Sequence, residues 1–269
     1  MDCLSIKNKH SRDKNIKFDE GNHIYTIDEP NYKPGKYISV TTFVHSHFDT
    51  FDSDKIIDNM MKGKNWINSQ YYGKTKDEIK KLWDKKRVSA SGDGTKLHRR
   101  IEDYYNSNQS DINADINADI NADNDTGFRY FLNFVSCNPT LNPYRTEWTV
   151  YHEDIGMAGT IDMVYENPDG TLSIYDWKRA KDISKNNRFN KYALTECIGS
   201  IPDTKYWHYA LQLNMYKSIL ERKYDKTVTK LALVVLHPDG TNFEIINLPI
   251  METEINKLFE MRKTKYDKY

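Results

Sequence analysis

Two aspartates and a lysine stand where a tight hairpin would bring them together. Asp162 lies in an apolar run over residues 159–166, and Asp176 and Lys178 lie in a second run over residues 171–178. Both runs are rich in β-branched and aromatic residues, which favour strands. Carboxylate oxygens bind hard cations such as Mg²⁺ or Mn²⁺, and an ammonium nearby can orient water or stabilise negative charge on a phosphate.

The sequence NPDG at residues 167–170 separates the two runs and is a strong turn signal. A three-residue loop with a bulge would place Asp162 opposite Asp176. A four-residue loop would instead place Asp162 opposite Tyr175. The three-residue loop also puts Asp162, Asp176 and Lys178 on one face, since side chains alternate along a strand.

Two ionised carboxylates at directly opposed positions repel each other. Opposed Cβ atoms lie about 4.5–5.5 Å apart, where the repulsion is about 4 kcal/mol at an effective dielectric near 20. A divalent cation between the two groups would offset this cost. The alternative is a surface hairpin with a salt bridge between Asp176 and Lys178. Both strands are apolar on both faces, however, which is typical of the centre of a sheet.

Asp162 followed by Asp176-Trp177-Lys178 resembles the D…(D/E)xK signature of the PD-(D/E)xK nuclease superfamily. Three further motifs, in the order found in the RecB-type branch, make this resemblance more specific. GTKLH at residues 94–98, followed by Glu102, is similar to the GTxxH…E helix of that branch, in which the histidine is a metal ligand.

The other two motifs lie on either side of the hairpin. QLNMY at residues 212–216 matches the QxxxY helix, and Glu147 fits the acidic residue in the strand before the hairpin. The resemblance covers roughly residues 92–238. It implies an α/β fold with a mixed central β-sheet flanked by helices, as in restriction endonucleases, after a mostly helical N-terminal region.

The resemblance implies a metal-dependent DNA exonuclease of the RecB or lambda-exonuclease kind, which acts in DNA repair, recombination or defence. Lys178 is expected to position the attacking water and to stabilise the transition state. Glu147 and Gln212 are expected to support the site, and the resemblance implies that Gln212 and Tyr216 contact the site or the scissile strand. The expected ligands of Mg²⁺ or Mn²⁺ are His98, Asp162, Asp176 and the Trp177 carbonyl.

Two alternatives remain open. The first is a structure-selective endonuclease of the same superfamily, and the second is a catalytically inactive DNA-binding partner subunit. The resemblance also admits a helicase or recombinase partner, and a homo-oligomer, because ring-forming members of the family thread DNA.

The chain of 269 residues has a formal net charge of zero, so any nucleic-acid surface must be a local patch. The best candidate follows the hairpin, where Phe189 and Tyr192 are interleaved with basic residues that could hold DNA phosphates. A solvated loop is the competing interpretation. The basic residues are Arg179, Lys181, Lys185, Arg188 and Lys191.

Cysteine usage and hydropathy favour a soluble intracellular protein. The three cysteines are far apart in sequence and too few for an iron–sulfur cluster with four cysteine ligands, which some RecB-type nucleases hold. No apolar run approaches a membrane span of roughly 20 residues, and the N-terminus lacks a hydrophobic signal core. Abundant Asn, Lys, Ile and Tyr suggest an AT-rich genome, for which a large DNA virus, acting in host cytoplasm, is one candidate source.

Residues 1–90 are expected to form a hairpin and helical region. The pattern predicts a small hairpin over residues 16–27, a strand that runs into a helix within residues 37–48, and helices over residues 52–64 and 75–87. His45 and His47 are interpreted as structural or surface residues. The second of the two long helices carries a run of lysines, which is interpreted as a solvated face or a phosphate contact.

Residues 91–269 are expected to form the nuclease core. Residues 91–94 (SGDG) predict a break before a helix over residues 95–106, and the repeat DINADINADINAD at 111–123 predicts an exposed insertion within residues 108–125. The further expected elements are helices at 127–137, 205–222 and 251–263, the strand containing Glu147, and strands at 230–237 and 242–248.

Overall fold

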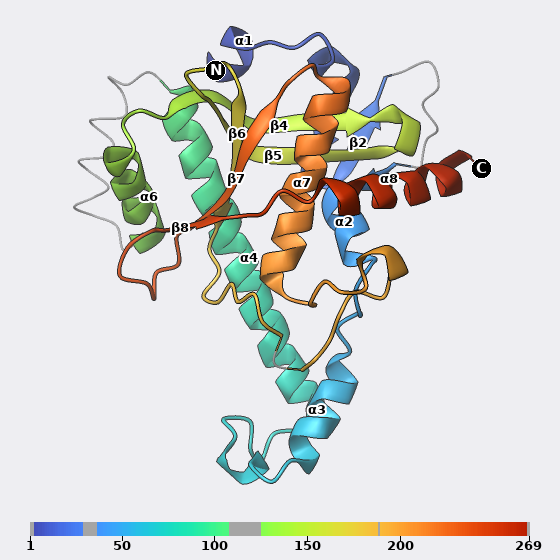
Figure 1. Cartoon of the computed structure of the whole chain (residues 1–269). Coiled ribbons are helices and arrows are strands. Elements are labelled where there is room, and N and C mark those ends of the chain that lie inside the picture. Colours follow the sequence, from blue (N-terminus) through green and yellow to red (C-terminus); the bar gives the residue numbers. More distant parts are fainter. Residues whose placement is uncertain (1–2, 29–36, 108–124, 188, 268–269) are drawn as a thin grey trace.

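The computed structural model describes residues 3–28, 37–107, 125–187 and 189–267. Within them the chain is an α/β protein with a mixed six-stranded sheet flanked by helices, as the sequence predicted (Figure 1). The predicted insertion of Asp-Ile-Asn-Ala repeats at residues 111–123, and Arg188, lie outside the described residues. None of the described helices is long and apolar enough to cross a membrane.

The sheet has the order β3-β5-β6-β7-β8, and β4 also pairs with β5. Strand β5 runs antiparallel to both β4 and β6, whereas β6 and β7 run parallel. The strand bounds are β1 Ile16–Asp19, β2 Ile24–Ile27, β3 Ile38–Ser39, β4 Asn142–His152, β5 Met157–Glu166, β6 Leu172–Lys178, β7 Val228–Val235 and β8 Glu244–Asn247.

Helices cover both faces of the sheet and bury two separate apolar clusters. One cluster joins α2, α7 and α8 to one face, and the other joins the end of α4 and α6 to the opposite face. The helices are α1 Cys3–Lys7, α2 Val40–His45, α3 Ser53–Lys62, α4 Lys76–Asn106, α6 Thr126–Cys137, α7 Lys205–Lys223 and α8 Glu252–Asp267. Short 3-10 turns lie at Asp13–Asn15, Trp66–Asn68, Glu153–Ile155 and Glu196–Ile198.

The central hairpin adopts the register that a three-residue loop predicts. The Asn167 N–H donates to the Thr171 carbonyl at 2.7 Å, and Gly170 takes a positive φ of 81°. The ladder pairs Met163 with Tyr175, so the next position along both strands aligns Asp162 with Asp176. The four-residue alternative is therefore excluded.

Most of the predicted elements are confirmed, with small changes in their bounds. The N-terminal hairpin forms as β1 and β2. Ser39 caps α2, Asp52 caps α3, and each accepts a backbone N–H through its side chain. Helices α6, α7 and α8 and strands β7 and β8 also lie where the pattern predicted them.

The predicted chain break at residues 91–94 is wrong, because α4 is one helix over 31 residues. Thr75 and Glu78 form a capping box at its start, and Ile79, Leu97 and Ile101 are buried along it. Gly92 and Gly94 cost about 1 kcal/mol each in a helix. The capping box and the buried side chains along α4 outweigh this cost. The boundary expected between residues 90 and 91 lies inside this helix, and the division into two domains stays a prediction.

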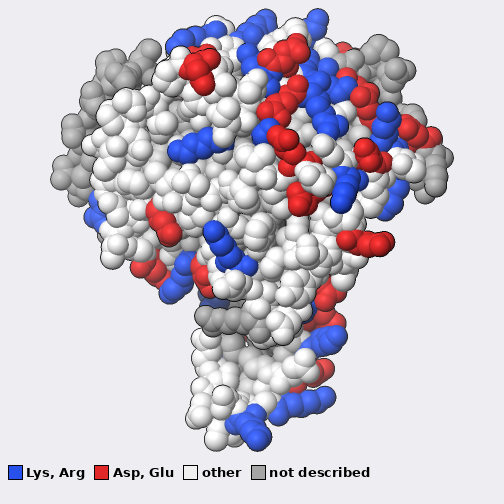
Figure 2. All heavy atoms as spheres, in the orientation of Figure 1, with Lys and Arg blue, Asp and Glu red and all other residues white. Residues whose placement is uncertain are grey.

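Residues 51–90 form a projection from the body of the protein, which we call the arm (Figure 1). It consists of α3, the turn at Trp66–Asn68 and the N-terminal half of α4. An ion pair of 2.5 Å between Lys80 and Asp54 ties the two helices together. The arm carries ten Lys or Arg against six Asp or Glu in a chain of zero net charge, and Figure 2 shows basic side chains along it.

Replacing Gly92 or Gly94 with alanine is expected to stabilise the protein by up to about 1 kcal/mol each. A Cβ at either position meets no atom within 4 Å, so only the helical preference changes. The matched control is Gly159→Ala, which should destabilise, because its Cβ would lie 2.6 Å from Tyr216 Cε1. Urea unfolding measures all three, and a loss of stability in both helical variants would contradict a continuous α4.

Two buried histidines are expected to make the fold sensitive to acid. Burial lowers the pKa of His47 and of His152 to about 4, below the ordinary value near 6.5. The folded chain thus binds a proton at each histidine more weakly than the unfolded chain does. The stability of the fold that depends on the neutral histidines is therefore complete above about pH 6.5 and is lost as the pH falls toward 4. Each unit by which the pKa is lowered corresponds to about 1.4 kcal/mol, so protonation of each histidine costs roughly 3 kcal/mol of folding stability.

The variant His152→Phe tests this dependence, because its ring can keep the packing against Phe259, whose ring centroid lies 5.7 Å away. Calorimetry between pH 7 and pH 4 should show a shallower fall of Tm in the variant than in the wild type. An identical fall in both proteins would show that His152 does not set it.

Candidate active site

Three carboxylates lie side by side at one level of the sheet. The ladder between β4 and β5 pairs Thr146 with Met163 and Trp148 with Ile161, which places Glu147 opposite Asp162. Asp176 lies opposite Asp162 on the other side, from the register of β5 and β6. Adjacent strands are about 4.8 Å apart, so Glu147, Asp162 and Asp176 form a row, which we call the acid row.

Burial increases along the acid row. The side chain of Glu147 is 32% exposed and that of Asp162 is 13% exposed, whereas Asp176 is 2% exposed. Glu147 also has a left-handed backbone with φ of 42°, which interrupts the regular geometry of β4 at this residue. The row therefore opens to solvent at its Glu147 end.

His98 of α4 approaches the open end of the row. Its Nδ1 lies 3.6 Å from Asp162 Oδ2 and 3.8 Å from Glu147 Oε1. Ligand atoms of these three residues lie within 4.8 Å of one another. Ligands at about 2.1 Å from an octahedral Mg²⁺ are themselves about 3–4 Å apart, so this group has dimensions that a small divalent cation fits.

The other nitrogen of His98 fixes the orientation of the ring. His98 Nε2 lies 3.0 Å from the Trp177 carbonyl oxygen, and because a carbonyl only accepts, Nε2 is the donor. A neutral His98 would then offer Nδ1 to a cation. The predicted role of the Trp177 carbonyl as a metal ligand stays a prediction, since the structure shows it accepting from the imidazole.

The acid row raises the affinity of His98 for a proton. Burial alone would lower the pKa of His98, but the charge of Asp162 and the interaction with Glu147 outweigh it and raise the pKa to about 9. The imidazolium thus supplies positive charge at the point where the three ligand atoms converge.

Asp176 and Lys178 form an ion pair at the buried end of the row. The Lys178 ammonium contacts Asp176 Oδ2, as expected for residues two apart on one strand face. Burial and the charge of Asp162 raise the pKa of Asp176 to about 6. Burial opposes the charge on Lys178, but Asp176 and Asp162 outweigh it and raise the pKa of the ammonium.

Asp162 lies between the two cationic groups and is held by the backbone. The Trp177 N–H donates to Asp162 Oδ2 at 3.0 Å. Burial raises the pKa of Asp162, although His98 and Lys178 act in the opposite direction. The predicted Asp162, Asp176, Lys178 and His98 are therefore brought together by β5, β6 and α4.

Helix α7 brings the QxxxY residues to the same face. The Gln212 amide donates to the Tyr216 hydroxyl at 3.5 Å, and the charges of Asp162 and Asp176 both act on that hydroxyl. Gly159 allows this approach, because a Cβ there would clash with the Tyr216 ring. Contact of Gln212 and Tyr216 with a substrate stays a prediction.

Two tyrosines at the site were not predicted as site residues. The Lys178 ammonium lies 4.8 Å from the centre of the Tyr209 ring. Tyr25 of β2 has its hydroxyl 3.0 Å from Thr160 Oγ1 and is influenced by the charges of Glu147 and Asp162. Tyr209 could have been predicted as a site residue, because it lies three residues before Gln212 and so on the same face of the helix. The sequence around Tyr25 held no comparable signal.

The predicted basic segment lies beyond β6, and its described cations have partners. Arg179 pairs with Asp93 at 3.3 Å, Lys181 with Asp239 at 2.7 Å, and Lys191 with Asp49 at 3.1 Å. The Lys185 ammonium lies 4.9 Å from the Tyr206 ring, and Phe189 is 83% exposed. Exposed ion pairs contribute only about 0–1 kcal/mol. Contact of this segment with DNA stays a prediction.

Neither the protein-family models nor the curated proteins include a match to this chain. Among solved structures, one match is described as the crystal structure of SSO0001. It is 14% identical, covers 88% of this chain and 79% of that chain, and has a TM-score of 0.34. A likeness of this size does not bear on function.

The variant Asp176→Asn is expected to separate metal binding from folding. It removes one of the three carboxylates of the acid row, and its amide oxygen can still accept a hydrogen bond from Lys178. Without added metal its Tm should therefore equal or exceed that of the wild type. Mn²⁺ or Mg²⁺ at about 100 times its Kd should stabilise the wild type by about 2.7 kcal/mol, and the variant much less. Calorimetry with metal or with EDTA measures both effects.

The matched control is Asp154→Asn, an exposed carboxylate that pairs with Lys223 and does not belong to the acid row. It should keep the full stabilisation by metal. A variant Asp176→Asn that unfolds more easily in EDTA yet keeps the wild-type response to metal would contradict this account of the site.

Proposed function

We propose that this protein is a metal-dependent deoxyribonuclease, and specifically an exonuclease of the RecB or lambda-exonuclease kind. The observation that carries the proposal is the convergence of three carboxylates from adjacent strands with one imidazole and one ammonium. A structural role alone does not account for it, because apolar residues would fill the same space with less electrostatic cost.

The charges of the site fit a divalent cation. Three carboxylates and the Lys178 ammonium leave a charge of about −2 when His98 is neutral, and one Mg²⁺ or Mn²⁺ balances it. Asp176 Oδ2 is also buried without a hydrogen bond of good geometry, although it contacts Lys178. When bound, the metal would supply Lewis-acid activation of water and of a phosphoryl oxygen.

Asp162, Glu147 and His98 Nδ1 are the groups best spaced to hold the cation. Glu147, expected from the sequence to support the site, thus joins the ligands in this proposal. Asp176 would contribute from the next strand once its pairing with Lys178 loosens. Its role as a ligand stays a prediction.

Lys178 and Asp176 would have different roles in the reaction. The raised pKa of Lys178 keeps it an ammonium at neutral pH, so it would orient water and stabilise negative charge on the phosphate rather than accept a proton. Burial and the charge of Asp162 raise the pKa of Asp176 to about 6 in the metal-free chain. Where Asp176 does not itself bind the metal, it would accept the proton of the attacking water.

Two basic surfaces would hold the DNA. Arg179, Lys181, Lys185 and Lys191 follow directly from the strand that carries Asp176 and Lys178. The arm presents a second set, which includes Lys81, Lys85 and Lys86 on α4, the helix that also carries His98. Phosphates bound at these residues would lead a strand toward the acid row. A helicase or recombinase acting inside the cell would supply DNA ends.

Removal of single site residues is expected to abolish cleavage of DNA. Lys178→Ala should lower the rate by roughly 100- to 1000-fold, the usual loss for one group that stabilises a transition state. Asp162→Ala and Asp176→Ala should lose at least as much. Release of end label from linear DNA with Mg²⁺ or Mn²⁺ measures the rate, and Asp154→Asn serves as the active control.

Circular DNA separates the candidate functions. An exonuclease digests linear DNA and leaves covalently closed circles intact, whereas a structure-selective endonuclease opens circles that carry a suitable structure. No metal-dependent cleavage of either substrate by the wild type, together with retained DNA binding, would instead identify the inactive DNA-binding subunit and refute the proposed activity.

A further inference from the structure

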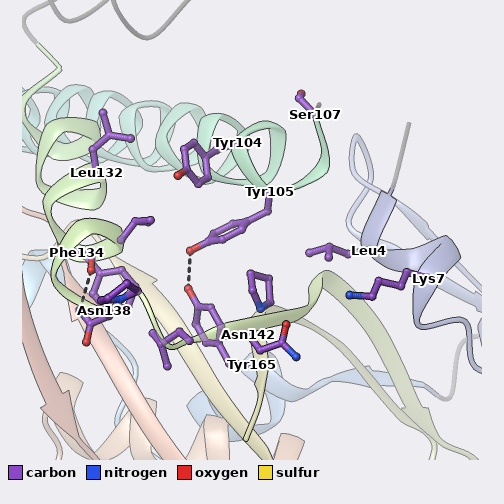
Figure 3. A pocket seen from close by; sticks show the side chains of 14 residues that line it. Leu4, Lys7, Tyr104, Tyr105, Ser107, Leu132, Phe134, Asn138, Asn142 and Tyr165 are labelled. Atoms are coloured by element: carbon purple, nitrogen blue, oxygen red, sulfur yellow. Dashed lines mark hydrogen bonds between the residues drawn. The ribbon is translucent and has the colours of Figure 1, made fainter. Parts of the chain in front are cut away.

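A cavity of about 500 Å³ lies on the face of the sheet opposite the acid row. Its walls come from α1, the end of α4, α6 and the beginning of β4, and Tyr165 of β5 forms its floor (Figure 3). Tyr165 belongs to the apolar cluster under α4 and α6. Side chains three positions apart on a strand face opposite ways, so Tyr165 and Asp162 lie on different faces.

The size and lining of this cavity are those of a site for a small molecule. Such sites are about 300–1,000 Å³ in volume and combine apolar walls with a few polar groups. Leu4, Leu132, Val135 and Leu141 supply apolar walls, and Tyr104 adds an aromatic one. The cavity is open to solvent, and the exposed Lys7 and Asn142 are among its lining residues, so a small molecule can enter it.

A pair of tyrosines leaves one hydrogen-bond donor unused inside the cavity. The hydroxyl oxygens of Tyr105 and Tyr165 are 2.6 Å apart (Figure 3). Two hydroxyls form one hydrogen bond between them, so the second O–H has no acceptor among the described residues. Tyr165 is only 1% exposed, and burial raises the pKa of both hydroxyls, so both keep their protons.

An unpaired donor at a buried position costs about 1–3 kcal/mol, and an acceptor entering the cavity would recover it. The ligand must therefore present an oxygen, as a carboxylate, carbonyl or phosphate does. Lys7 favours an anion, because it is the one charged side chain among the described residues lining the cavity. Its single positive charge matches a carboxylate better than a phosphate monoester, which carries about −1.5 to −2 at pH 7. No carboxylate in the described part of the chain pairs with its ammonium, so an anion would have an unopposed partner there.

We propose that this cavity binds a small carboxylic acid with an apolar or aromatic body. The carboxylate lies between the Lys7 ammonium and the free O–H of the tyrosine pair. The body packs against Leu132, Leu141 and Tyr104. This proposal does not rest on the proposed nuclease activity, because none of the lining residues belongs to the acid row.

Calorimetric titration with 2-naphthoate tests the proposal on the full chain, with neutral 2-naphthalenemethanol as the matched probe. The acid should bind one site with a Kd of about 0.1–1 mM, as expected for a ligand of this size. The alcohol should bind at least about tenfold more weakly, because it lacks the charge that Lys7 attracts.

Three variants locate the binding. Lys7→Gln and the double variant Tyr105→Phe with Tyr165→Phe should each weaken naphthoate binding about fivefold or more. Leu132→Trp should fill the cavity and abolish binding. Lys64→Gln, which removes an exposed lysine from the arm, is the control and should bind like the wild type. If Leu132→Trp fails to fold, the surface variant Lys7→Gln still decides the matter.

The absence of saturable binding of 2-naphthoate up to about 10 mM would overturn the proposal and leave water as the acceptor of the free O–H. Binding that is equal for acid and alcohol, or that persists unchanged in Lys7→Gln, would overturn it as well, because the charge and position argued for the ligand would then be wrong.

Discussion

Mutual repulsion among three carboxylates in one row of the sheet is the constraint on which the rest of the site depends. Glu147, Asp162 and Asp176 come from neighbouring strands at one level, so the backbone ladder itself holds them together. His98 and Lys178 place positive charge at the two ends of the row. The remaining repulsion is unfavourable, and the divalent cation that we propose would offset it.

The elements around the row act mainly to set the positions of those charges. Helix α4 is long enough to begin in the arm and still deliver His98 to Asp162. Glu147 has a left-handed backbone, a conformation that costs of order 1–3 kcal/mol for a residue other than glycine. Strain of this kind persists where the surrounding structure fixes it. At Glu147 it coincides with the end of the acid row that is open to solvent.

The part of the site that depends on local chain geometry could be predicted from sequence. The turn at residues 167–170 fixed the register, and the register fixed the pairing of Asp162 with Asp176. The continuous α4 could not be predicted, because local glycine signals at Gly92 and Gly94 were outweighed by anchoring to distant residues. Tyr25 was missed for a similar reason, since a two-stranded hairpin does not reveal which strand it will pack against.

The site around the acid row and the cavity share α4, β4 and β5, although the acid row and the cavity lie on opposite faces of the sheet. Tyr105 follows His98 by two turns on α4, and Tyr165 follows Asp162 by three residues on β5. The packing of α4 on β5 thus sets both the distance between Tyr105 and Tyr165 and the distance between His98 and Asp162. The second distance is part of the spacing that the proposed cation would fit. The distance between α4 and β5 therefore sets both the geometry of the acid row with His98 and the geometry of the tyrosine pair in the cavity.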